Sequence, residues 1–113
     1  MSLAERLLAA WDGAALVALP SAESASFSMA DAFAAADAVR SLRSARGEKP
    51  VGYKIGFTNR SIWQRYGVHQ PIWGPVWDST LSLLDAAAAR VPLRGLSQPR
   101  LEPEVVFGFA SAP

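Results

Sequence analysis

The sequence predicts an α+β fold in which two N-terminal helices pack on a small mixed β-sheet. Two observations predict it. Apolar residues recur at helical spacing through the first 45 residues, and short segments rich in β-branched and aromatic residues follow Pro50. Half of the 113 residues are apolar and 19% are charged, which is the balance of a globular protein, so a single domain spanning 1–113 is expected.

The first helix is predicted over residues 2–18, where leucine, tryptophan and alanine repeat every three or four positions. Pro20 and the serines that follow it end this helix. Ser28, with Asp31 three residues later, predicts the N-cap of a second helix. Gly47 is its predicted C-terminal stop.

The first strand is predicted over residues 51–57, VGYKIGF. Thr58 or Asn59 is then expected to cap a short helix that Gly67 closes. Residues 68–77 are rich in proline, glycine and tryptophan and are interpreted as an ordered loop. Further strands are predicted at residues 80–84, 90–93 and 101–109.

Composition excludes several classes of function. Eleven basic against ten acidic residues leave a net charge of +1, which favours neither nucleic acid nor an anionic membrane as a partner. Without cysteine, neither disulfides nor thiolate metal sites are available. The first 19 residues are interrupted by Glu5, Arg6 and Asp12, so they resemble neither a signal peptide nor a membrane span. A cytoplasmic protein is expected.

Two glutamates stand on either side of Pro103. In a strand, Glu102 and Glu104 would point to the same face, about 7 Å apart. Oxygen ligands at this separation suit a hard divalent ion such as Mg²⁺. The alternative is a solvated strand face with two ordinary glutamates, and the spacing alone favours this second interpretation.

Lys54 lies between Tyr53 and Ile55, with glycines two residues away on each side. A partly desolvated lysine can carry a proton or hold a substrate carboxylate, whereas a lysine at a sheet edge more often keeps its amine in water. Trp73 belongs to a group of aromatic residues that could wall a pocket or seal a core. Asp78 is either a functional carboxylate or the start of a turn.

Two motifs carry a family resemblance: V-G-x-K-I-G-x-T at Val51–Thr58 and Q-P-R-x-E-x-E at Gln98–Glu104. In this order and at this separation, they make the chain resemble the 2-keto-4-pentenoate hydratase / 4-oxalocrotonate decarboxylase family, within the fumarylacetoacetate hydrolase-like group. The resemblance runs from about Met29 to Phe109.

The resemblance implies a metal-dependent lyase of aromatic catabolism. Glu102 and Glu104 would bind Mg²⁺ or Mn²⁺, which chelates a 2-oxo acid and stabilises its enolate-like charge. Lys54 would be catalytic, assisting proton transfer or holding the substrate carboxylate, and Tyr53, Trp73 and Asp78 would contact the substrate. The hydratases of this family add water to a 2-hydroxy-2,4-dienoate, and their relatives decarboxylate 4-oxalocrotonate or hydrolyse carbon–carbon bonds.

The chain departs from the family pattern in two ways. Ile72 stands where hydratases commonly carry an acidic residue, and no acidic residue follows Glu104 to supply the family's third carboxylate ligand. The chain is therefore expected to be the N-terminal part of such an enzyme, with an incomplete fold, weak metal binding and no activity alone. Unpaired strand edges predict a homodimer. The alternative is a catalytically silent, dimerising structural or interaction protein that keeps the family fold.

Overall fold

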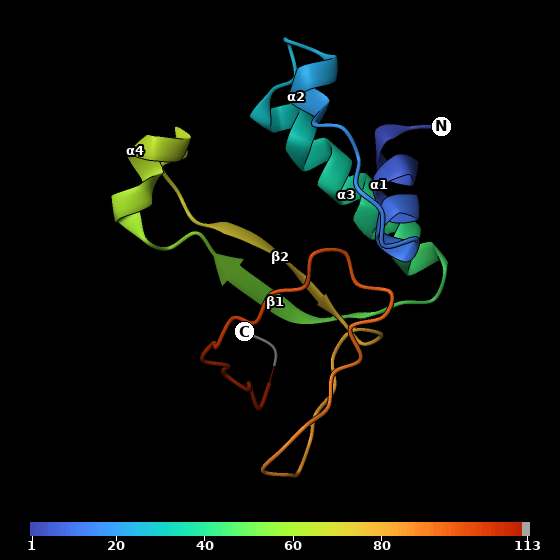
Figure 1. Cartoon of the computed structure of the whole chain (residues 1–113), viewed down its shortest axis with the longest axis vertical. Coiled ribbons are helices and arrows are strands. Elements are labelled where there is room, and N and C mark those ends of the chain that lie inside the picture. The colour runs from blue at the N-terminus through green and yellow to red at the C-terminus, as the bar shows by residue number, and fades with distance from the viewer. Residues whose placement is uncertain (112–113) are drawn as a thin grey trace.

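The computed structural model describes residues 1–111, and its described part confirms the α+β class (Figure 1). A pair of helices lies beside a twisted ribbon of two antiparallel strands. In chain order the elements are α1 (Leu3–Asp12), α2 (Pro20–Glu23), α3 (Met29–Ala45), β1 (Pro50–Gly56), the 3₁₀ helix η1 (Arg60–Ile62), α4 (Trp63–Tyr66) and β2 (Ile72–Trp77). None of the helices in residues 1–111 is both long and apolar enough to cross a membrane.

Helix α1 is shorter than predicted. Ser2 caps it from outside, because its hydroxyl accepts from the Glu5 backbone N–H while the Glu5 carboxylate accepts from the Ser2 N–H. Gly13 ends the helix, and Ala14 turns the chain away with φ of 50°. The prediction that this helix continues to Ala18 is therefore wrong.

Helix α3 confirms its predicted start and stop. Ser28 and Asp31 form a reciprocal capping box, and Gly47 follows the last turn with φ of 97°, a conformation that glycine adopts without steric cost. Pro20, which was expected only to end the first helix, is instead the first residue of α2. A backbone N–H at this position has no partner within a helix, so proline is tolerated there.

Helices α1 and α3 run in the same direction. Their first turns line one hollow, and near their far ends Asp12 of α1 accepts from Arg46, one residue beyond α3, at 2.7 Å. Ala4 is buried between them, where small side chains allow the two backbones to approach closely. Residues 13–28 return the chain across the pair, and α2 is tied back to α1 by a two-point ion pair between Arg6 and Glu23.

The ribbon pairs Gly52 with Val76, Lys54 with Gly74 and Gly56 with Ile72. Strand β1 was predicted, but β2 lies in the segment interpreted as a loop, so that interpretation is wrong. Pro75 lacks an N–H and fits β2 because both outer edges of a two-stranded ribbon are free of hydrogen-bond demands. At the open end, Asp78 Oδ1 accepts from the backbone N–H groups of Lys49 and Ser79 at 2.9 and 2.8 Å.

The connection between the strands projects away from the helix pair (Figure 1). Asn59 caps η1, and Gly67 ends α4 with φ of 64°, which confirms the predicted short helix and its stop. The Trp63 indole N–H donates to the Phe57 carbonyl at 2.8 Å, and the Tyr66 ring meets the Phe57 ring edge-on. These contacts hold the connection together without contributions from the helix pair.

An arginine occupies the centre of the packed region. Arg43 and Trp77 are buried, with 6% and 5% of their surfaces exposed. The Arg43 guanidinium lies 4.9 Å from the Trp77 ring centroid and 5.3 Å from that of Trp11, so the ion joins α1, α3 and β2. It also donates to Glu48 at 2.7 Å, whereas its Nε–H has no partner. The helix pair therefore packs on the Trp77 face of the ribbon.

Residues 78–111 form neither helix nor strand in the described chain. The strands predicted at 80–84, 90–93 and 101–109 are therefore wrong, and the sheet is antiparallel rather than mixed. Pro92, Pro99 and Pro103 lack the N–H that a ladder requires. The chain exposes 9661 Å², against about 6,000 Å² for a compact monomer of this mass.

Candidate functional site

The predicted metal and catalytic residues meet in space. Strand β1 presents Lys54 near its middle, and the C-terminal segment brings Glu102 and Glu104 to the same amine. Lys54 Nζ lies 2.5 Å from Glu104 Oε1 and 3.2 Å from Glu102 Oε2. Although no strand forms there, both carboxylates reach the same amine, as the alternation of side chains in an extended segment predicts. We refer to these three residues as the lysine–glutamate cluster.

The cluster is half-exposed, with 50%, 64% and 49% of the side-chain surfaces of Lys54, Glu102 and Glu104 open to solvent. The hydrogen bond to Glu104, followed by that to Glu102, raises the pKa of Lys54 above its ordinary value. The lysine is therefore an ammonium at neutral pH, and its single positive charge leaves one of the two carboxylate charges unbalanced. The arrangement can hold a cation, or deliver a proton from a fixed N–H.

The ribbon face around Lys54 is nearly free of side chains. Gly52 and Gly56 flank the lysine on β1, and Gly74 stands directly opposite on β2. A Cβ at any of the three would meet nothing within 4 Å, and none has a φ in the left-handed region. Neither packing nor backbone conformation thus requires glycine here. What the glycines provide is a flat floor of peptide groups beside the cluster, bounded by Ile72 diagonally across from Lys54.

The other expected substrate contacts lie elsewhere. Tyr53 and Trp73 touch edge-on, with ring centroids 5.5 Å apart, and by strand alternation they occupy the ribbon face opposite Lys54. Asp78 lies four residues beyond Gly74, about 13 Å along the strand, where it closes the ribbon. The structure therefore brings together Lys54 and the two glutamates, but not the three residues expected to contact substrate.

Sequence reasoning missed Gly74 and the position of Ile72 as parts of this face. The signal was present in the alternation of I-W-G-P-V-W, which places residues 72, 74 and 76 on one side once the segment is recognised as a strand.

The donor atoms of the cluster are carboxylate oxygens, which are the type of ligand that a hard divalent cation prefers. Two carboxylates converge on one point, and their exposure leaves room for the water ligands that Mg²⁺ usually keeps. Across residues 1–111, no three His, Cys, Asp or Glu side chains gather closely enough to hold a metal ion. Glu102 and Glu104 alone would hold the ion from this chain, and the Lys54 ammonium stands where it would compete.

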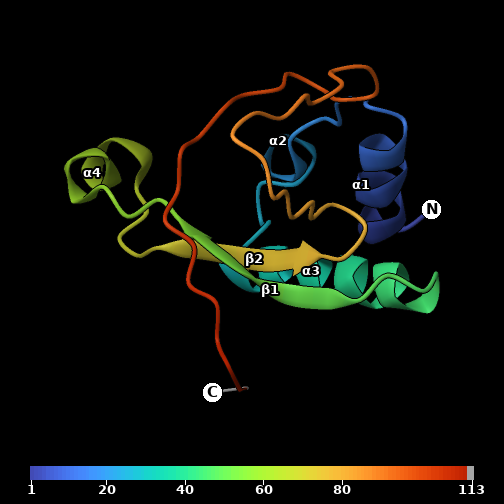
Figure 2. The ribbon, with the colours of Figure 1, turned by 90° about the horizontal axis from the view of Figure 1, so that it is seen from below.

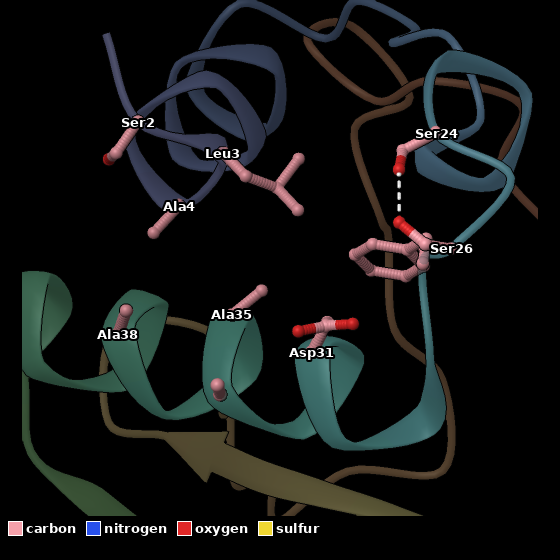
Figure 3. A pocket seen from close by; sticks show the side chains of 10 residues that line it. Ser2, Leu3, Ala4, Ser24, Ser26, Asp31, Ala35 and Ala38 are labelled. Atoms are coloured by element: carbon pink, nitrogen blue, oxygen red, sulfur yellow. Dashed lines mark hydrogen bonds between the residues drawn. The ribbon is translucent and has the colours of Figure 1, made fainter.

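A second candidate, a hollow of about 500 Å³, opens between the first turns of α1 and α3 (Figure 3). Leu3, Ala35 and Ala38 line it, and the Asp31 carboxylate caps its own helix. Ser24 and Ser26 share a hydrogen bond at its rim. Its polar groups are already paired, so the hollow lacks the free ionisable groups of a reaction site.

Comparisons with known proteins point to one group of enzymes. The chain is 42% identical over 66 residues to 2-hydroxyhexa-2,4-dienoate hydratase from Comamonas testosteroni, covering 58% of this chain and 25% of that protein. It is 36% identical over 66 residues to 2-keto-4-pentenoate hydratase from Paraburkholderia phymatum, covering 58% and 24%. No family model matches the chain.

Among solved structures, 4-oxalocrotonate decarboxylase from Pseudomonas putida G7, complexed with magnesium and adipate, matches with a TM-score of 0.65 and 30% identity, covering 68% of this chain and 29% of that one. The same enzyme complexed with calcium and acetate matches with the same TM-score. The chain spans about a quarter of the length of the curated relatives it matches.

The matched proteins belong to one class, the hydratases named above together with 4-oxalocrotonate decarboxylase, and the decarboxylase structures are complexed with magnesium or calcium. In particular, the resemblance to the 2-keto-4-pentenoate hydratase / 4-oxalocrotonate decarboxylase family is confirmed over 58–68% of the chain.

Proposed function

We propose that this chain carries part of a divalent-metal-dependent lyase site for 2-hydroxy-2,4-dienoates or the related 2-oxo acids. The observation that supports the proposal is the lysine–glutamate cluster, in which residues 50 positions apart in sequence meet at one amine. The names of the relatives, which are dienoate hydratases and an oxalocrotonate decarboxylase, supply the substrate class.

Each residue of the cluster has a distinct task in this proposal. Glu102 and Glu104 hold Mg²⁺ or Mn²⁺, which when bound supplies positive charge toward the oxygens of the acid. Lys54, whose amine is protonated at neutral pH at its ordinary pKa, pairs with the substrate carboxylate or donates a proton from Nζ. The glycine floor accepts a planar conjugated chain at van der Waals distance, because a Cβ at Gly52, Gly56 or Gly74 would meet nothing within 4 Å.

The identity of residue 72 bears on which of two reactions, hydration or decarboxylation, the proposed site would support. It borders the floor with an apolar side chain that can neither accept nor donate a proton, so chemistry that needs an acid or base at this place is disfavoured. Decarboxylation would break the bond to the leaving carboxylate, releasing carbon dioxide, and the electron pair of that bond would pass into the conjugated 2-oxo system, which would take a proton from Lys54 Nζ or from water. It would need no acid or base at position 72. The proposal therefore favours decarboxylase-like chemistry over hydration. It also includes a cytoplasmic location and a homodimer.

The test combines metal binding with binding of the two acids by the chain. We expect millimolar Mg²⁺ or Mn²⁺ to raise the thermal midpoint, since an ion that binds only the folded state stabilises it. The double variant Glu102→Gln, Glu104→Gln should lose that rise, while Asp85→Asn, which removes a carboxylate far along the chain, should keep it.

Substrate binding is read from the change in ultraviolet absorbance when 2-hydroxypenta-2,4-dienoate or 4-oxalocrotonate is titrated with the chain in the same metal, because a partial site is not expected to turn the acids over alone. Lys54→Met should abolish binding of either acid without abolishing the metal response. A chain whose thermal midpoint responds to neither ion, and which binds neither acid, would instead be the silent structural protein.

A further inference from the structure

The lysine–glutamate cluster already contains one cation, the ammonium group of Lys54. Its Nζ lies 2.5 Å from Glu104 Oε1 and 3.2 Å from Glu102 Oε2, so the ammonium holds the point on which both carboxylates converge. These are also the two carboxylates that the proposed site offers to a divalent ion. Because two cations repel each other, one point between two carboxylates cannot hold both. Metal binding by this pair therefore requires the Lys54 side chain to move.

Lys54 is also the residue that holds the two glutamates against the ribbon. Figure 2 shows the C-terminal segment crossing the ribbon. Among the hydrogen bonds and ion pairs described for residues 1–111, only those with Lys54 involve residues 97–111. Without a cation between them, Glu102 and Glu104 would repel each other in water. The ammonium therefore gathers both carboxylates at one point before any metal ion arrives.

The surroundings of Lys54 give its side chain room to move. Half of its side-chain surface is exposed, and Gly52, Gly56 and Gly74 around it carry no side chain with which it would collide. The flexible four-carbon stem of a lysine changes rotamer readily, so the amine can pass from the carboxylates to the space over the glycine floor. That space is where the proposed function places the conjugated acid.

We propose that Lys54 is an internal counter-ion, which keeps Glu102 and Glu104 together before a metal ion binds and moves onto the glycine floor when the ion takes its place. This inference rests on the metal site of the proposed function and adds an order of binding to it. While the ammonium lies between the carboxylates, one of their charges stays unbalanced and repels an anionic acid. After the exchange the amine can pair with the carboxylate of the acid, so the metal binds first.

The affinity for Mn²⁺ measures this competition. The electron paramagnetic resonance signal of free Mn²⁺, followed as the ion is titrated into the chain, gives the dissociation constant. Lys54→Met removes the ammonium and keeps an unbranched stem. It should lower the constant about three- to tenfold, because two half-exposed ion pairs no longer have to be broken. Lys54→Arg keeps the charge and should bind Mn²⁺ no more tightly than the unmodified chain.

Lys49→Met is the matched control, since Lys49 is the only other lysine of the chain. It lies five residues earlier, about 16 Å along an extended backbone, where salt screens its charge from the glutamates. The same substitution at this position should therefore leave the dissociation constant unchanged.

The position of the amine is read from nuclear magnetic resonance of a chain labelled with ¹³C at the lysine Cε atoms. Only Lys49 and Lys54 then give signals, and Lys49→Met assigns them. Saturating Mg²⁺ should shift the Lys54 signal and leave that of Lys49 in place. The double variant Glu102→Gln, Glu104→Gln should abolish the shift.

The outcomes separate this inference from the proposed function. Equal dissociation constants for the unmodified chain and Lys54→Met would overturn the inference and leave the metal site intact. A Lys54 signal that stays in place while Mg²⁺ binds would do the same. If neither the unmodified chain nor Lys54→Met binds either ion, both the inference and the proposed function are wrong.

Discussion

Replacing Arg43 by methionine tests whether the buried ion stabilises the fold. Methionine keeps an unbranched stem of similar length between the two rings but removes the charge. The contact with Trp77, which is desolvated, contributes about 2 kcal/mol, and that with the half-exposed Trp11 about 0.5–1 kcal/mol. Removing the unpaired Nε–H returns about 1 kcal/mol or more. Glu48 keeps Arg46 and Ser79 as partners, so it is not left orphaned.

The balance is a net loss of about 1–2 kcal/mol, or about 5–10 °C in the thermal midpoint for a chain of this size. Urea unfolding followed by circular dichroism at 222 nm measures it. Arg40→Met, one turn earlier on α3 and exposed, is the matched control and should change the free energy of unfolding by less than about 0.5 kcal/mol. If Arg43→Met were as stable as the unmodified chain, the attraction of the rings would not exceed the cost of burying the ion, and the reasoning would be refuted.

Two other expectations concern Glu48 and the glycine floor. Hydrogen bonds from Arg46 and then from Ser79 lower the pKa of Glu48 from 4.5 to about 2, so its contribution to stability is complete above pH 4.5 and disappears as the pH falls toward 2. Thermal midpoints measured from pH 6 to 2.5 should fall less steeply in Glu48→Gln. Gly74→Val should preserve or raise stability, because valine favours strands, yet weaken binding of the proposed substrates about tenfold. Ile55→Val, on the opposite face, should leave that binding unchanged, and a Gly74→Val chain that binds the acids as well as the unmodified chain would remove the floor from the site.

Local chemistry explains why the helices and β1 could be predicted. Ser28 with Asp31, Asn59, and Gly67 act within a few residues of themselves, so short sequence windows contain the cause of each boundary. The end of α1 at Gly13 was missed because the apolar period continues past a glycine that nevertheless turns the chain.

The errors and omissions come from interactions between distant residues. Nothing near Arg43 in the sequence indicated that Trp11 and Trp77 would enclose it. The three later strands were predicted from composition, but a strand exists only where an edge is available to pair with it. The meeting of Lys54 with Glu102 and Glu104 was anticipated through the family resemblance, whereas their spacing alone favoured ordinary solvated glutamates.

The two faces of the ribbon carry different groups. Its Trp77 face carries the contacts with the helices, and its lysine face carries the cluster and the bare peptide floor. Substitutions on the lysine face therefore change few buried contacts, and substitutions on the tryptophan face leave the lysine–glutamate cluster in place. A single two-stranded element thus keeps the groups of the proposed site apart from the groups that hold the fold together.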